Sequence, residues 1–282
     1  MNRKFSINAD KLLVKPLGYL LMTIVTVMST VPFIWVFLSS FKTNREIFNN
    51  PIALPSQWTF ASYREAIRLS NLHLVYLNSI IISVCATVAA VIIFALMAYV
   101  LARKVLPGSK IIFAILISSI LIPSNALIQP IYSTIQSLNL YDTRTGLILI
   151  YTAFGLPVSL FVMKNYFQNL PREMEEAAEI DGAGFATIFL RIMLPLAKPA
   201  VACALTLIFI NNWNEFMYAY LMTTTRASRT LPVAIRYFVS EFAFDHSAMF
   251  AAVMMIAVPS MTAYFVMQNQ IMESLVTGAV KG

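Results

Sequence analysis

A run of polar residues interrupts one of the most apolar stretches of the chain, over residues 211–215. Four side chains in and after this run have the i, i+3, i+4, i+7 spacing of one helix face: Asn211, Asn214, Glu215 and Tyr218. Such a face combines amides, a carboxylate and an aromatic ring, which suits a polyhydroxylated solute. Hydrogen bonding between helices explains the same residues equally well. Contact with a solute and hydrogen bonding between helices are also the two interpretations of Ser124 and Asn125.

The sequence lacks the motifs with which a chain binds and hydrolyses nucleotides. It contains no G-x-x-x-x-G-K-[ST], and G-x-S-x-G, H-E-x-x-H and G-x-G-x-x-G are also absent. His73 and His246 each stand alone, so we expect no metal site and no catalytic residue. Energy for any transport must come from an ion gradient or from another subunit. Glu215 is the one ionisable residue inside an apolar stretch, whereas ion-driven carriers usually place several there.

An acidic segment, residues 164–199, is the second chemically distinctive region, with five of the 13 acidic residues of the chain. Pro171 and the acids that follow it predict a helix whose first turn includes this proline. Gly182 predicts the end of that helix, because glycine readily adopts a left-handed conformation.

A second short helix is expected over about 185–193, ending before Pro195. Phe185, Phe189 and Ile192 recur at i, i+4, i+7 and form one apolar stripe. An exposed aromatic ridge of this kind would suit docking to another protein. A helix that lies on the membrane surface or beneath its own bundle is the alternative.

The composition defines the environment in which these residues must act. Of the 282 residues, 59% are hydrophobic and 12% are charged, whereas an average soluble domain has about 45–50% apolar and about 25% charged residues. Such a chain is neither an ordinary soluble protein nor disordered, and we expect a polytopic membrane protein. Basic loops that face anionic lipid explain the formal charge of +7, so no nucleic-acid partner is expected.

Six apolar stretches are long enough to cross a bilayer, whose core requires about 20 helical residues. They are 17–41, 79–101, 111–132, 146–163, 200–222 and 250–272. We therefore expect an all-α membrane protein with six transmembrane helices. Four prolines inside these stretches predict kinks: Pro123, Pro130, Pro157 and Pro259.

The distribution of lysine predicts the orientation. Six spans place both termini on the same side. With the N-terminus in the cytoplasm, eight of the nine lysines lie inside and only Lys42 lies outside, in agreement with the positive-inside rule. We therefore expect both termini in the cytoplasm, with segment 164–199 also inside and the long segments 42–77 and 223–249 outside.

The acidic segment also has a recognisable pattern. Its residues read Glu176-Ala177-Ala178-Glu179-Ile180-Asp181-Gly182 and, after nine further residues, Ile192-Met193-Leu194-Pro195. This resembles the EAA loop of binding-protein-dependent ABC importer permeases, in which E-A-A, a glycine and a distal I-x-L-P recur at fixed spacing. Matches in the order of the maltose-type carbohydrate permeases extend over almost the whole chain: Phe41-Lys42-Thr43, Trp213-Asn214-Glu215-Phe216, Thr230-Leu231-Pro232 and Gly278-Ala279-Val280-Lys281-Gly282.

The resemblance implies the type I ABC importer permease fold and a set of partners. A second homologous permease would complete the pathway, two ABC ATPase subunits would bind from the cytoplasm, and an extracytoplasmic solute-binding protein would deliver a sugar or oligosaccharide. ATP and Mg²⁺ would be bound by the ATPases, and this chain would bind no cofactor and catalyse no reaction. Such complexes lie in the cytoplasmic membrane of bacteria or archaea, in contact with membrane lipid.

The resemblance also implies roles for individual residues. The coupling residues that would meet the ATPase are Glu176, Ala177, Ala178, Asp181, Gly182, Phe185, Ile192, Leu194 and Pro195. Residues that would line or gate the translocation pathway are Asn211, Asn214, Glu215, Tyr218, Ser124 and Asn125. Gly278, Ala279, Val280, Lys281 and Gly282 would reach toward the ATPase pair, and segment 223–249 would contact the binding protein. The expected organisation is a cytoplasmic tail (1–16), a permease domain (17–272) with its coupling loop (164–199), and a C-terminal tail (273–282).

Three alternatives remain open from the sequence. An ABC permease for an amino acid, a polyamine or a metal would carry the same coupling loop. A secondary carrier would work without an ATPase. A membrane enzyme would need a nucleophile with a base or paired carboxylates, and the apolar stretches contain neither.

Overall fold

The computed structural model describes the backbone of residues 6–70, 72–104, 106–238 and 245–279, and the side chains of 15–68, 72–104, 106–236, 238 and 245–269. Every regular element in this part of the chain is a helix, which confirms the expected all-α class. The chain divides into two compact units: Met1–Leu69 with Tyr237–Met255, and Ser70–Arg236 with Ile256–Gly282.

The first unit contains a long apolar helix, α1 (Ser6–Ser39), that has little packing inside the chain. None of its most apolar 18-residue window is buried, and Tyr19 is 70% exposed. Near its end, Trp35 contacts Phe250 of α15 (His246–Ala279), with ring centroids 5.1 Å apart. A helix that is apolar and unburied needs lipid or another protein around it.

Residues 42–69 of the first unit are ordered by short helices. Thr43 and Glu46 form a capping box at the start of α2 (Asn44–Asn49). Hydrogen bonds from the Ser56 hydroxyl and the Thr43 amide lower the pKa of Glu46 to about 2. The helix α3 (Ala61–Ser70) places Ala66 in a small core with the first turns of α15.

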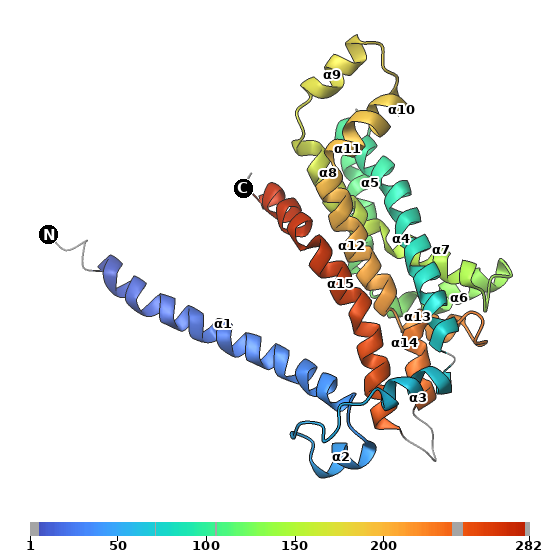
Figure 1. Cartoon of the computed structure of the whole chain (residues 1–282). Helices are drawn as coiled ribbons and strands as arrows, with labels where there is room; N and C mark the ends of the chain where they lie inside the picture. The colour runs from blue at the N-terminus through green and yellow to red at the C-terminus, as the bar shows by residue number, and fades with distance from the viewer. Residues whose placement is uncertain (1–5, 71, 105, 239–244, 280–282) are drawn as a thin grey trace. The chain divides into compact units, whose positions relative to one another are not determined.

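In the second unit, α4 (Leu72–Arg103) packs against α7 (Arg144–Phe154), α8 (Leu156–Asn169) and α12 (Lys198–Asn214), as Figure 1 shows. The buried face of α4 includes Ala86, Ala90 and Ala98, none of which is exposed. Small residues allow helix backbones to approach closely. At Gly155, between α7 and α8, an added Cβ would lie 2.7 Å from the Cβ of Ala90. The joint between α7 and α8 therefore requires glycine.

Three helices of the described part are long and apolar enough to cross a membrane: Lys15–Ser39, Leu72–Arg103 and His246–Asn269. Up to three further spans are possible if each pair of helices joined by a sharp bend is one span. The expected span at 146–163 is such a pair, because the chain bends by 42° between α7 and α8. Pro157 lies in the first turn of α8, whereas Pro259 lies within α15 and does not end it.

Two expected spans are interrupted. At 111–132, the segment of α5 (Ser109–Ser118) and η1 (Ser119–Leu121) meets η2 (Ser124–Leu127) and α6 (Ile128–Ser137) at 98°. Pro123 lies at this break and Ile122 before it is extended, as expected for a residue that precedes proline. At 200–222, α12 ends at Asn214 and α13 (Met217–Met222) follows after a break. The kink predicted at Pro123 is therefore a full break of the helix, whereas the break after Asn214 was not predicted.

Candidate functional site

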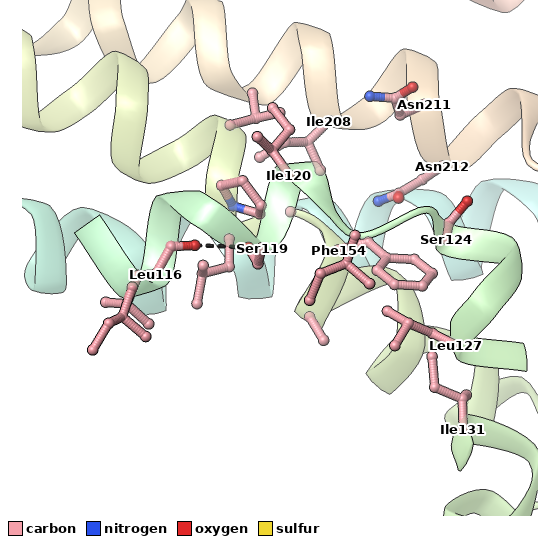
Figure 2. A pocket seen from close by; sticks show the side chains of 17 residues that line it. Leu116, Ser119, Ile120, Ser124, Leu127, Ile131, Phe154, Ile208, Asn211 and Asn212 are labelled. Carbon is pink, nitrogen blue, oxygen red and sulfur yellow. Dashed lines mark hydrogen bonds between the residues drawn. The ribbon is translucent and has the colours of Figure 1, made fainter. Parts of the chain in front are cut away.

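A cavity of about 700 Å³ lies in the second unit where the interrupted helices meet (Figure 2). Its walls come from the α5–η1 segment, the η2–α6 segment, the joint between α7 and α8, and α12. Most side chains in the lining are apolar, such as Ile120, Leu127 and Phe154. The polar side chains of the lining are Ser119, Ser124, Asn211 and Asn212.

Figure 2 shows Asn211, Asn212 and Ser124 gathered toward one end of the cavity. The amide of Asn212 donates to Thr87 Oγ1 of α4 over 3.1 Å, and Ser119 Oγ donates to the carbonyl oxygen of Leu116 over 2.7 Å. Asn211 and Ser124 are exposed, and neither side chain forms a hydrogen bond with the described part of the chain. These two residues therefore offer polar groups to a solute in the cavity.

Glu215 occupies the break between α12 and α13, and its carboxylate is held within the chain. Its Oε1 accepts a hydrogen bond from the Tyr218 amide (2.8 Å). Its Oε2 accepts from the Ala219 amide (3.0 Å) and from the Tyr151 hydroxyl (2.6 Å). Because both amides belong to the first turn of α13, Glu215 caps the start of that helix. Its carboxylate fixes the joint, and Glu215 is not among the residues that line the cavity.

The break also separates the residues that a continuous helix would place on one face. Asn214 Nδ2 donates to Ser260 Oγ of α15 over 3.0 Å. The Tyr218 hydroxyl donates to the carbonyl oxygen of Ser124 over 2.6 Å. Tyr218 thus holds the backbone of η2 beside the cavity, while Asn125 is exposed and does not line it.

Two of the six expected pathway residues, Asn211 and Ser124, line the cavity, and sequence reasoning missed two polar lining residues. Asn212 belongs to the polar run, but helical periodicity places it about 100° away from the face that was chosen. Ser119 lies in an apolar stretch and has no neighbouring signal in the sequence. The partner of Glu215, Tyr151, lies 64 residues away in the chain, so no local pattern predicts their contact.

The loop at 223–230 is tied to two other segments of the second unit. Asn78 Nδ2, on α4, lies within 2.9–3.3 Å of three carbonyl oxygens of this loop, those of Arg226, Ala227 and Arg229. Ser79 Oγ accepts from the amide of Leu231 over 2.7 Å. The start of α4 and this loop are therefore a single hydrogen-bonded assembly.

Asp142, in the loop between α6 and α7, binds the same loop from another side. Its carboxylate accepts from the Thr224 and Thr225 amides and from the Ser228 hydroxyl. Partial burial raises the pKa of Asp142, but the hydrogen bond from Ser228 and those from the two amides outweigh it. The pKa therefore lies below the usual range.

The segment 164–199 forms a projection at one end of the second unit, as α9 (Glu173–Ile180) and α10 (Phe185–Thr187) show in Figure 1. The helix α9 begins two residues after Pro171, so this proline lies before the helix and not in its first turn. Gly182 has φ of +80°, which confirms the expected left-handed stop. Glu176, Ala177 and Asp181 are exposed, whereas Ala178 is buried.

Two ion pairs attach α9 to the end of α4. Arg103 Nε lies 3.5 Å from Glu175 Oε1, and the two side chains are 3% and 10% exposed. A terminal nitrogen of Arg103 also donates to the carbonyl oxygen of Leu170 over 2.6 Å. Lys104 Nζ lies 3.3 Å from Glu179 Oε1 in a pair that is much more exposed. The buried pair connects the projection to the central helix of the unit.

The expected aromatic ridge is exposed only at Phe185, because Phe189 is buried and Ile192 is partly buried. Phe189 is 7% exposed, and its ring centroid lies 5.2 Å from that of Tyr99 on α4. Phe185 also contacts Tyr99, at 5.6 Å, but remains 44% exposed. The alternative interpretation, a helix packed beneath its own bundle, describes this segment better.

A π-helix, η3 (Ile188–Met193), explains why simple helical periodicity failed here. Its wider turn changes which side chains share a face, so Ile188 and Met193 are buried while Ile192 is only partly buried. The helix also does not end before Pro195, because α11 (Leu194–Leu196) continues through that residue. Leu194 is partly buried and Pro195 is exposed.

The expected ATPase-contacting terminus lies mostly outside the described residues. Gly278 and Ala279 belong to the last turn of α15, but their side-chain environment is outside the described part. Val280, Lys281 and Gly282 lie outside it altogether.

Comparison with known families gives a match over almost the whole chain. A family model described as the binding-protein-dependent transport system inner membrane component matches residues 7–271. The diacetylchitobiose uptake system permease protein NgcG of Streptomyces coelicolor is 34% identical over 267 residues, which are 94% of this chain and 88% of the relative. The trehalose transport system permease protein SugB of Mycobacterium tuberculosis is 32% identical over 262 residues, 92% of this chain and 95% of the relative.

Two solved structures have a similar fold. A chain of a bacterial ABC transporter involved in the import of the acidic polysaccharide alginate aligns with a TM-score of 0.78 at 24% identity, covering 93% of this chain and 97% of that chain. A chain of the bacterial alginate ABC transporter in complex with an alginate pentasaccharide-bound periplasmic protein aligns with a TM-score of 0.58 at 16% identity, covering 95% and 96%. At these identities the likeness concerns the fold.

Proposed function

Because the chain belongs to the family of binding-protein-dependent transport system inner membrane components, we propose that it is a permease subunit of an ATP-driven importer for a sugar or oligosaccharide. Membership in this family makes it a membrane-embedded transport component. The substrate class rests on one observation. Relatives that are at least 32% identical over more than nine-tenths of this chain are named as permeases for diacetylchitobiose and for trehalose.

The 700 Å³ cavity supports this proposal as one part of a translocation pathway. Its largely apolar wall carries exposed amide and hydroxyl groups on Asn211 and Ser124. A few polar groups on an apolar wall can orient a sugar, whose hydroxyl groups need hydrogen-bond partners and whose ring faces are apolar. We assign Glu215 and Tyr218 to positioning the helices around the cavity, because their polar atoms are already bonded within the chain.

The coupling role is assigned to the projection around α9. The chain has no nucleotide-binding motif, so two partner ATPases would supply ATP and Mg²⁺ chemistry. Glu176, Ala177, Asp181 and the stop at Gly182 are exposed at the outer side of the projection. The Arg103–Glu175 pair connects this surface to α4. Movement of an ATPase against α9 would thus be transmitted to α4 and to the helices packed on it as a rigid-body displacement.

The remaining partners complete the proposed importer. A second homologous permease would form the other side of the pathway, and an extracytoplasmic solute-binding protein would deliver the sugar to the segment 223–249. The proposed orientation places both termini and the α9 projection in the cytoplasm of a bacterium or archaeon. The tails 1–16 and 273–282 would then flank the permease domain on its cytoplasmic side.

Uptake in a strain that lacks the gene tests the proposal. We expect loss of uptake of at least one labelled disaccharide from a panel that includes trehalose and diacetylchitobiose, and recovery with the wild-type gene. Glu176→Lys should fail to restore uptake, whereas Glu173→Lys, a charge-matched change at another exposed position of the same helix, should restore it. Loss of amino-acid or polyamine uptake alone would contradict the sugar assignment. Uptake that stops when the ion gradient is collapsed at high ATP would contradict the importer mechanism.

A further inference from the structure

A second cavity of the second unit, of about 260 Å³, is lined by cations and by no acidic residue. It lies where α4 ends, α5 begins and α8 ends, beside the α9 projection. Its charged lining residues are Arg103, Lys104, Lys110, Lys164 and Arg172. The ion pairs that attach α9 account for Arg103 and Lys104, but neither the pathway nor the proposed coupling contacts account for Lys110, Lys164 and Arg172.

The charge of this cavity is only partly compensated within the chain. Arg103 and Lys104 form the ion pairs with Glu175 and Glu179. Among the described residues, Lys110, Lys164 and Arg172 form no ion pair, and Lys164 Nζ lies 4.1 Å above the ring of Phe113. Positive charges held close together repel one another most strongly where water is partly excluded. An anion in the cavity would remove this repulsion.

The start of α5 also faces the same cavity. Its first residues, Ser109 and Lys110, are part of the lining. The residue that precedes them, Gly108, has φ of +74° and provides no side-chain cap. The Ser109 and Ile111 amides donate to the carbonyl oxygens of Leu106 and Gly108, so among the first three amides of α5 only that of Lys110 lacks a backbone partner within the described residues. The start of a helix also carries partial positive charge, which favours an anion at this position. Both the uncapped helix start and the cations therefore favour an anion as the ligand.

The surroundings indicate the source of that anion. Beyond the cavity, α5 exposes aliphatic side chains that do not line the 700 Å³ cavity, with Ile111 and Ile112 67% and 43% exposed. A ligand with a charged phosphate group and hydrocarbon chains would satisfy the cavity and this apolar face together. We propose that the cavity binds the phosphate group of an anionic phospholipid, at the end of the bundle where α9 is attached.

The site would link lipid composition to the coupling loop. Arg103 and Lys104 line the cavity and also hold α9 through Glu175 and Glu179. A bound phosphate group would compete with these carboxylates for the two cations or share them. The lipid would therefore influence how firmly the α9 projection is held.

Native mass spectrometry of the full-length chain, purified with its associated subunits, tests this proposal. Phosphatidylglycerol and phosphatidylcholine with the same acyl chains are titrated separately. The wild-type protein should bind phosphatidylglycerol in preference to phosphatidylcholine. In the double variant Lys110→Gln, Lys164→Gln the affinity for phosphatidylglycerol should fall about 30-fold, on the basis of about 1 kcal/mol for each cation.

The matched control is the double variant Arg191→Gln, Lys198→Gln. It removes two exposed cations of the segment 164–199 that do not line the cavity. This control should bind phosphatidylglycerol as the wild type does, and all three proteins should remain folded, as their thermal unfolding shows. Equal affinity of the wild type and the cavity variant, or no preference over phosphatidylcholine, would overturn the proposal. Displacement of the lipid by inorganic phosphate would overturn the lipid assignment and identify a soluble phosphate compound as the ligand.

Discussion

Two glutamates of the second unit each hold a joint between helices, but they are bound by different kinds of partner. Glu215 lies at the break between α12 and α13 and accepts hydrogen bonds from two amides and the Tyr151 hydroxyl. Glu175 lies at the base of the α9 projection and is paired with Arg103. The first joint is stabilised by neutral donors, and the second by an opposite charge.

The difference follows from what surrounds each joint. A cation beside Glu215 would place a second charge among apolar helices, which is costly in a bilayer, whereas amides at a helix start are available there without added charge. At the end of α4, a cation can reach both a carboxylate and the backbone carbonyl of Leu170. We therefore expect that removing the charge of Arg103 at the α9 joint destabilises the fold more than removing the charge of Glu215 at the break between α12 and α13.

The largest effect is expected for Arg103→Ala. This change leaves Glu175 buried without a partner, and loss of one member of a buried ion pair costs about 3–5 kcal/mol. Lys104→Ala is the matched control, because its pair with Glu179 is exposed and should contribute under about 1 kcal/mol. Thermal unfolding of the purified chain measures both variants. Equal destabilisation would show that burial does not distinguish the two pairs.

A smaller effect is expected for Glu215→Gln. One amide oxygen replaces two carboxylate oxygens, so at least one donor loses its partner, at about 1.5–3 kcal/mol. Tyr151→Phe removes a single donor and should cost about 1 kcal/mol. We expect uptake to fall in the order wild type, Tyr151→Phe, Glu215→Gln, with ATPase binding unchanged. Unaltered uptake in Glu215→Gln would indicate that the polar run at residues 211–215 only packs against other helices.

Gly182→Ala tests the turn that ends α9. At φ of +80° a side chain is strained even though no atom lies within 4 Å of the added Cβ, and the cost is about 1–2 kcal/mol. Gly184→Ala is a close control, because its φ of −74° suits any residue and its added Cβ also meets nothing within 4 Å. Its effect should stay within about 0.5 kcal/mol. The free energy of unfolding is measured by chemical denaturation. Equal values for the two variants would contradict a stabilising role of the turn at Gly182.

Asp142 is a third carboxylate that holds two segments together, and the loss of its charge is expected to have the smallest effect of the three. Its folded pKa is lowered, so its contribution is fully present above the ordinary aspartate pKa of about 3.9 and is lost as the pH falls through the folded value. Hydrogen exchange of residues 223–230, corrected for the intrinsic rate, should therefore be constant from neutral pH to about 5 and rise at lower pH. Asp142→Asn should lack this acid-induced rise. If hydrogen exchange of residues 223–230 rises in the same way in Asp142→Asn, a titrating group other than Asp142 causes the rise.

Sequence periodicity predicted the long helices well, because their apolar character does not depend on distant partners. The span expected at 79–101 lies inside α4, and the one at 250–272 lies inside α15. The stop at Gly182 was also predictable, since one residue type favours the required backbone conformation.

The breaks were harder to predict, because residues far away in the chain stabilise them. Nothing local to Glu215 indicates that Tyr151 and the start of α13 hold its carboxylate. The π-helix at Ile188–Met193 shifts the helical register, so the stripe through Phe189 was placed on the wrong side. Pro123 indicated a kink, but a proline alone does not predict a bend as large as 98°.

The proposed importer complex is tested by identifying the proteins that co-purify with the tagged chain in mild detergent from its native membrane. We predict a second permease and an ABC ATPase, with the ATPase lost in the double variant Glu176→Lys, Gly182→Asp and retained in Glu173→Lys, Gly184→Ala. Recovery of a lone chain or a homodimer that still transports sugar would contradict the account.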